Sequence, residues 1–275
     1  FPAVFNLATQ VVKLVAIFAF VRGPDDYMAL AYMNLANAVV LTAGVLGCMR
    51  FVLAGEREEH RGSTSPSLGR IARESSVFYA TSLSTTLVGS ASSFVMGSFG
   101  GGQGLARYSI GDKVIALGKS MYAPALSALF PFLSRKAAQR DGGLHATRRL
   151  LIAPVLAAAT LGTGALVVFA PFIVKVMAGE GYEASVAILR ILALKFIVNA
   201  AGDFLFMQYA YPLGLERGML AIFTIGGFAS VGLSAAGYAL GGAIGLAWAT
   251  VLSELAVHAS TAILVMSALR RRKGA

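Results

Sequence analysis

The sequence predicts an all-α polytopic membrane protein, and three observations support this fold class. Hydrophobic residues make up 57% of the chain and charged residues only 13%, whereas a soluble domain carries about 25% charged residues. Eight apolar stretches recur along the chain, and each is long enough to span a bilayer as a helix. Short polar turns join most of them, so no loop is large enough to hold a soluble domain.

We expect about eight transmembrane helices, taken in order from the N-terminus. The apolar stretches that predict them lie at residues 3–21, 27–53, 71–98, 105–133, 148–178, 184–212, 216–238 and 241–269. The chain begins at Phe1 without an initiator methionine or a signal-peptide n-region, so we interpret it as a fragment. The single cysteine, Cys48, allows no disulfide framework within the chain.

The distribution of basic residues predicts the orientation in the membrane. A polar linker at 54–70, a basic connection at 135–149 and the tail from Arg270 to Lys273 fall on one side when the spans are counted. Cytoplasmic loops carry the excess of Lys and Arg, so these three segments, and the C-terminus, are predicted to be cytoplasmic. The net charge of +10 therefore reflects loop placement, and no nucleic-acid partner is expected.

Charged and polar residues recur at helical spacing inside three of the predicted spans. The fourth span carries Asp112 and Lys119 seven residues apart, and the sixth carries a stripe that begins at Lys195. A charge held in hydrocarbon costs about 2.5–3.5 kcal/mol on insertion scales. We therefore expect these faces to line a hydrated cavity. The stripes of the sixth and eighth spans consist of Lys195, Asn199 and Asp203, and of Thr250, Glu254, His258 and Thr261.

The cations outnumber the carboxylates in and near the spans, and this excess suits an anionic substrate such as a pyrophosphate group. The candidate substrate-binding residues are Arg107, Lys113, Lys119, Lys195 and Asn199, with Asp112 and Asp203 as charge-balancing partners. Glu254 and His258, one helical turn apart, fit either a proton or ion-coupling pair or a structural hydrogen-bonded pair between helices. Lys175 and Arg190, near span ends, are expected to reach the interface.

The known catalytic and cofactor motifs are absent from the sequence. Gly118-Lys119-Ser120 resembles the end of a P-loop, but Lys113 stands where that motif needs glycine. The three histidines show no zinc spacing, and no nucleophile elbow occurs. We therefore predict a protein that is not an enzyme and that uses no cofactor and no metal.

Several segments resemble the family of polysaccharide and O-antigen flippases, which move lipid-linked oligosaccharides. The first is ARYSIGDKVIALGKSMYAPALSALFPFLSRK, which contains Tyr108-Ser109, Phe130-Pro131 and a basic end. In the family, a glycine-rich turn leads to a helix with these features. The second is VMAGEGYEASVAILRILALKFIVNAAGDFLF, and the third is the segment from Gly242 to Ala247 that opens the last span. The order and spacing of these segments extend the resemblance across nearly the whole chain.

The resemblance implies an incomplete two-bundle exporter fold of the multidrug/oligosaccharidyl-lipid/polysaccharide exporter superfamily, corresponding to its C-terminal two-thirds. Residues 1–53 would supply the last two helices of the first bundle, 54–70 the cytoplasmic linker, and 71–275 the second six-helix bundle.

The function that the resemblance implies is export of an undecaprenyl-pyrophosphate-linked oligosaccharide by alternating access. It would act across the bacterial inner membrane in O-antigen, capsule or exopolysaccharide biosynthesis. Its partners would be membrane lipids, this substrate, and the polysaccharide polymerase and chain-length machinery. The alternatives are a peptidoglycan-precursor flippase, a drug/cation antiporter of the same superfamily, and a non-transporting membrane scaffold. An antiporter would favour an acidic, aromatic-lined cavity.

Overall fold

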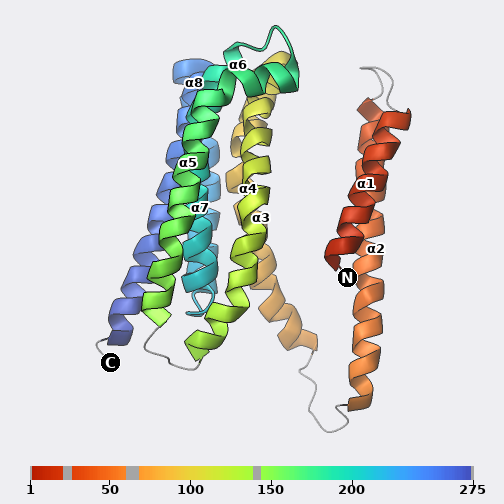
Figure 1. The fold of residues 1–275 in the computed structure, drawn as a ribbon, viewed down its shortest axis with the longest axis vertical. Helices are drawn as coiled ribbons and strands as arrows, with labels where there is room; N and C mark the ends of the chain where they lie inside the picture. The colour runs from red at the N-terminus through yellow and green to blue at the C-terminus, as the bar shows by residue number, and fades with distance from the viewer. Residues whose placement is uncertain (1, 21–26, 60–67, 139–143, 274–275) are drawn as a thin grey trace. The chain divides into compact units, whose positions relative to one another are not determined.

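The computed structural model describes residues 2–20, 27–59, 68–138 and 144–273, and over these residues it consists of helices and short turns (Figure 1). Two compact units divide the chain, Phe1–Ser67 and Leu68–Ala275, and each is described by itself. The predicted all-α membrane fold is confirmed. The residues of the linker at 60–67 and of the basic connection at 139–143 lie outside the described part.

The first unit is a pair of helices, α1 (Pro2–Phe20) and α2 (Tyr27–Glu59). The two helices pack together, and the ring of Phe5 lies directly against Gly44, where no side chain intervenes. Large apolar side chains such as Val12 and Leu35 are exposed along both helices. An exposed apolar surface of this kind suits contact with lipid.

The second unit is a bundle of helices that correspond, in order, to the last six predicted spans. Its elements are α3 (Leu68–Phe99), α4 (Gly101–Ala138), α5 (Leu144–Ala178), α6 (Ala184–Leu192), α7 (Leu194–Leu205), the π-helical turn η1 (Phe206–Ala210) and α8 (Glu216–Lys273). The segments α6, α7 and η1 follow one another as a single span. Pro154 and Pro171 interrupt the hydrogen-bond ladder of α5, since proline has no backbone N–H.

The long helix α8 consists of two antiparallel arms. The break lies at Gly241 and Gly242, and Gly242 has a φ of 58°, a conformation that only glycine adopts readily. A Cβ atom added at Gly218 would lie 2.8 Å from the side chain of Leu264, and one at Gly226 would collide with Val257. The arms therefore pack along a seam where glycine lets the backbone approach closely.

The described ends of the helices of the second unit lie at two opposite ends of the bundle (Figure 1). The N-terminus of α3, the end of α4 and the C-terminus of α8 lie at the lower end of the view. The α3–α4 turn, where Gly101 has a φ of 66°, lies at the upper end with the α5–α6 connection. Helices that cross a membrane in alternating directions need their successive ends on opposite sides, and this arrangement provides that. The assignment of the two units to two exporter bundles stays a prediction.

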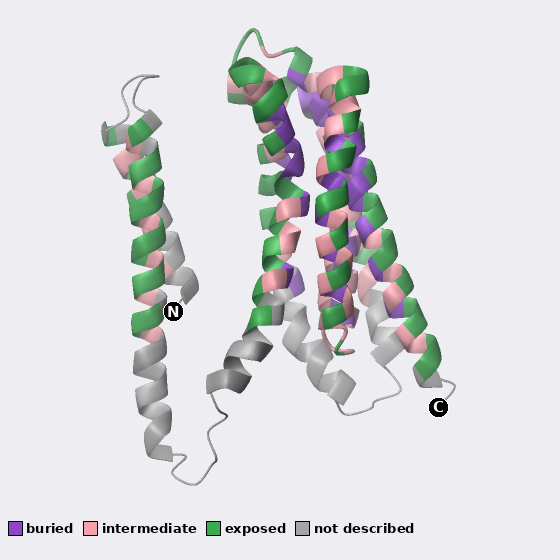
Figure 2. Ribbon diagram, turned by 180° about the vertical axis from the view of Figure 1, so that it is seen from behind, coloured by how far each residue is buried: buried purple, intermediate pink, exposed green. Residues whose placement is uncertain are grey.

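Four segments of the described residues are long and apolar enough to cross a membrane by length and composition. They are Ala31–Cys48, Leu151–Ala178, Ala184–Ala210 and Glu216–Arg271, the last of which contains both arms of α8. Within the second unit, buried residues face one another between the helices (Figure 2). One apolar cluster surrounds Tyr108 and Leu192, and another surrounds Met219 and Val265.

Candidate functional site

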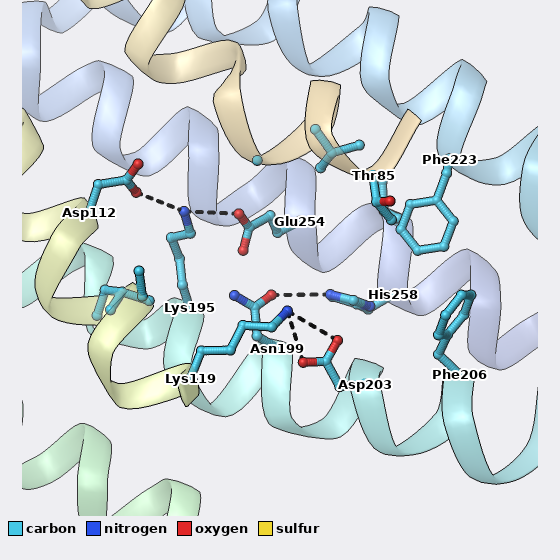
Figure 3. A pocket seen from close by; sticks show the side chains of 15 residues that line it. Thr85, Asp112, Lys119, Lys195, Asn199, Asp203, Phe206, Phe223, Glu254 and His258 are labelled. Atoms are coloured by element: carbon cyan, nitrogen blue, oxygen red, sulfur yellow. Dashed lines mark hydrogen bonds and ion pairs between the residues drawn. The ribbon is translucent and has the colours of Figure 1, made fainter. Parts of the chain in front are cut away.

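The polar stripe of α7 faces a cavity of about 280 Å³ inside the second unit (Figure 3). Lys195, Asn199 and Asp203 all line it. Residues four apart on a helix share one face, so this spacing alone aims the three side chains in one direction. The remaining lining residues come from α3, α4, η1 and both arms of α8: Thr85, Val88, Gly89, Asp112, Ile115, Ala116, Lys119, Phe206, Phe223, Glu254, Val257 and His258.

Lys195 joins three helices through two ion pairs. Its Nζ lies 2.9 Å from Oε1 of Glu254 on α8 and 3.2 Å from Oδ1 of Asp112 on α4. The side chains of Lys195 and Glu254 are 5% and 7% exposed, whereas that of Asp112 is 26% exposed. The hydroxyl of Ser93 on α3 also donates to Oδ2 of Asp112, at 3.4 Å. The ammonium group of Lys195 is therefore held between two carboxylates inside the bundle.

Lys119 forms a second, more accessible ion pair. Its Nζ lies 2.9 Å from Oδ2 of Asp203, and its side chain is 47% exposed. The hydroxyl of Tyr122 donates to the same oxygen at 3.0 Å. The ring of Tyr122 packs edge-on against Phe196, which in turn lies close to Gly118 on α4 and Gly162 on α5. Two residues of α4, Lys119 and Tyr122, thus bond Asp203, while the side chain of Lys119 remains partly exposed.

His258 forms a hydrogen bond with a residue of α7 rather than with its neighbour Glu254. Its Nε2 lies 3.2 Å from Oδ1 of Asn199, and its imidazole ring lies directly against Gly202, where a Cβ atom would collide with it. Glu254 and His258, although one turn apart, therefore hold different partners. Nδ1 of His258 and Oε2 of Glu254 are both buried and have no hydrogen-bond partner.

Seven of the nine predicted site residues line this cavity and two do not. Lys113 is exposed on α4 and lies outside the cavity lining. Arg107, near the start of α4, is half-buried and lies close enough to Glu183 to interact with it electrostatically. Residues at i and i+1 point about 100° apart on a helix, which explains why Lys113 leaves the cavity that Asp112 enters.

The charge balance of the cavity differs from the expectation for the spans as a whole. Three carboxylates, Asp112, Asp203 and Glu254, face two lysines, Lys119 and Lys195. With a neutral imidazole the lining therefore carries one excess negative charge, although the sequence predicted an excess of cations. The reason is that the two candidate cations that would tip the balance, Arg107 and Lys113, lie elsewhere.

The side of the bundle formed by α3 and α4 carries polar groups on its exposed surface. Ser82, Thr86 and Ser90 recur at four-residue spacing on α3 and are all exposed, as are Lys113 and Ser120 on α4. Large apolar side chains are exposed on α3 and α4 as well, for example Phe94 and Leu117, and on α5 they include Leu161, Val168 and Phe172. A lysine facing hydrocarbon is costly. The polar groups exposed on α3 and α4 are therefore suited to water or a polar ligand, although they stand among exposed apolar side chains.

Several lining residues were not predicted as part of a site. Thr85 belongs to the Ser- and Thr-rich third span, so its polarity was visible but its position was not. Phe206 and Phe223, whose rings contact at 5.7 Å between centroids, gave no signal among many other aromatic residues. Within the described residues, no group of three or more His, Cys, Asp or Glu side chains is placed to hold a metal ion.

These features define an all-α polytopic membrane protein with a charged cavity inside one helical unit. Residues 2–136 match the family of polysaccharide biosynthesis proteins, which confirms the predicted resemblance to the polysaccharide flippases. The match covers just under half of the chain, on its N-terminal side, so it differs from the expectation of a resemblance across nearly the whole chain. No curated protein and no solved structure matches the chain. The correspondence to the C-terminal two-thirds of the fold stays a prediction.

Proposed function

We propose that this protein takes part in moving an undecaprenyl-pyrophosphate-linked oligosaccharide across the bacterial inner membrane during surface polysaccharide biosynthesis. The observation that carries the proposal is the charged cavity, with exposed polar side chains on α3 and α4 beside it, in a chain whose residues 2–136 match polysaccharide biosynthesis proteins. A charged cavity between membrane helices favours transport over a scaffold role, which needs no charges at that depth. We propose transport by alternating access, with the C-terminus in the cytoplasm and no catalytic step.

The exposed lysines of α4 are the groups that we propose to contact the anionic part of the substrate. Lys119 is 47% exposed even while paired with Asp203, and Lys113 is exposed without entering the cavity. A phosphate could displace the carboxylate from Lys119, because an accessible ion pair contributes only about 0–1 kcal/mol. Lys195 is less suited to this role than the sequence suggested, since it is buried between two carboxylates.

Surface-glycan export tests this proposal. The protein should restore export in a cell whose own polysaccharide flippase has been deleted, and the Lys113→Ala/Lys119→Ala variant should lose export at unchanged abundance in the membrane. Lys175→Ala is the matched control, because Lys175 is an exposed lysine near the end of α5 and should retain export. Normal export by the double variant would exclude the assigned roles, and failure of the unaltered protein to restore export would contradict the function.

The acidic balance and the two phenylalanines of the cavity favour one alternative, export of organic cations in exchange for a coupling ion. An excess carboxylate in a cavity that Phe206 and Phe223 also line offers a cationic ligand both charge and aromatic contacts. Efflux of a fluorescent cationic dye from the same cells discriminates the two functions. Dye efflux without glycan export would support the antiporter, whereas glycan export without dye efflux would support the flippase.

A further inference from the structure

The carboxylate of Asp203 receives two donors from one helix, α4. Nζ of Lys119 lies 2.9 Å from its Oδ2 and 3.3 Å from its Oδ1, and the hydroxyl of Tyr122 donates to Oδ2 at 3.0 Å. Lys119 and Tyr122 are three residues apart, so they lie on the same face of α4. Oδ2 therefore shares a flexible lysine and a tyrosine as its donors.

The ring of Tyr122 is fixed by packing between α4, α5 and α7. It lies edge-on to the ring of Phe196 on α7, with the centroids 5.5 Å apart and the planes at 73°. Phe196 in turn occupies space that two glycines leave open, because a Cβ atom at Gly118 or Gly162 would lie 2.7 or 2.5 Å from its ring. The hydroxyl of Tyr122 therefore keeps its place when the ammonium group of the neighbouring lysine moves.

Release of Lys119 would leave Asp203 without a positive partner. The side chain of Asp203 is only 23% exposed, and it lines a cavity that has three carboxylates and two lysines. A partly buried carboxylate that loses its donors is destabilised. A phosphate that takes Lys119 from Asp203 therefore binds more tightly if another donor continues to hold the carboxylate.

We propose that Tyr122 is a positioning residue for the anionic substrate, because its hydroxyl holds the carboxylate of Asp203 while Lys119 turns to the phosphate. The inference rests on the proposed contact between Lys119 and the substrate, and it gives Tyr122 itself no contact with the substrate. The exchange breaks one ion pair and keeps one hydrogen bond. Once Lys119 has left, Oδ2 carries more negative charge, so the hydrogen bond from Tyr122 becomes stronger.

Binding of inorganic pyrophosphate to the purified protein tests this role. The line width of the ³¹P NMR signal of pyrophosphate should be followed as protein is added in a phosphorus-free detergent. Lys119→Ala defines the part of the binding that needs Lys119, and Tyr122→Phe keeps the ring but removes the hydroxyl. We expect Tyr122→Phe to weaken the Lys119-dependent binding about three- to tenfold, less than the full strength of a hydrogen bond to a charged group, because Asp203 can regain some water.

The Asp203→Asn variant separates positioning from a purely structural role. Its amide carries no charge, so Lys119 is released and should bind pyrophosphate more tightly than in the unaltered protein. In this background Tyr122→Phe should change the affinity by less than about twofold, because the carboxylate through which Tyr122 acts is gone. Tyr238→Phe is the matched control, since the hydroxyl of Tyr238 donates to the carbonyl of Phe99 at 3.1 Å outside the cavity lining, and it should bind like the unaltered protein.

The two proposals fail in different ways. Equal pyrophosphate affinity of Tyr122→Phe and the unaltered protein would overturn the positioning role, and so would an equal loss from Tyr122→Phe in the unaltered and the Asp203→Asn backgrounds. Pyrophosphate binding that Lys119→Ala does not weaken would overturn the substrate contact of Lys119 and the positioning role together. The function itself is tested separately, by restoration of glycan export.

Discussion

Replacing Lys195 by methionine should destabilise the second unit strongly, because it strands a buried carboxylate. Lys195 and Glu254 are 5% and 7% exposed and 2.9 Å apart. Removal of one partner of a buried ion pair costs about 3–5 kcal/mol, since the other charge is left uncompensated. Asp112, at 26% exposure, can regain water and should add little. In a unit of about 200 residues, 1 kcal/mol moves the melting temperature by about 2–4 °C, so we expect a fall of about 6–20 °C.

Thermal unfolding in one detergent, followed by circular dichroism, measures this effect. Lys119→Met is the matched control, because Lys119 is 47% exposed and such a pair contributes about 0–1 kcal/mol. The double variant Lys195→Met/Glu254→Gln should recover much of the lost stability, because neither side chain then carries a charge. If Lys195→Met melts within about 2 °C of the unaltered protein, the assignment of a buried, energetically coupled pair is wrong.

Three further predictions concern close contacts and one exposed carboxylate. Gly162→Ala should lower the melting temperature, since its Cβ would lie 2.5 Å from the ring of Phe196 and overpacking costs about 1–3 kcal/mol; Gly164→Ala, with open space around it, is the control. Gly202→Ala should push away the imidazole of His258, and an NMR spectrum of labelled histidine should register the loss of the Asn199 bond, which an unchanged spectrum would refute. The N–H groups of Glu183 and Gly181 stabilise the Glu183 carboxylate and lower its pKa. Because the pKa of Glu183 is lower in the folded state, the carboxylate stabilises the fold above the usual pKa of Glu, and this contribution is lost as pH falls through the lowered value. An NMR titration that placed the Glu183 pKa at or above its usual value would contradict this prediction.

The sequence predicted the helices and most of the cavity because both follow from spacing along single helices. Lys195, Asn199 and Asp203 share a face whatever surrounds them, and the apolar stretches must form helices in a membrane. The same reasoning did not distinguish neighbouring residues that point to different sides of a helix. Asp112 and Lys113 were assigned to one site, although a single helical step turns Lys113 to the outer surface.

The partners of each charge could not be predicted, because pairing depends on how helices distant in the sequence are arranged. Glu254 and His258 looked like a pair by their spacing, yet each bonds a different residue of α7. The π-helical turn at Phe206–Ala210, which adds a residue to one turn, likewise has no signature in composition. It brings Phe206 to the cavity lining and buries Gln208, whose amide donates to the carbonyl of Leu126.

The ion pairs of α7 also bear on the order in which the helices enter the membrane during synthesis. Lys195 and Asp203 together would cost about 5–7 kcal/mol if α7 were released alone into lipid. Their partners on α4, Asp112 and Lys119, have already been made when α7 leaves the ribosome, whereas Glu254 is made afterwards. We therefore expect α7 to remain at the insertion machinery until α4 is beside it. Chains in which Asp112 and Lys119 are both replaced by leucine should place α7 across the bilayer less often, as glycosylation mapping of truncated chains would measure.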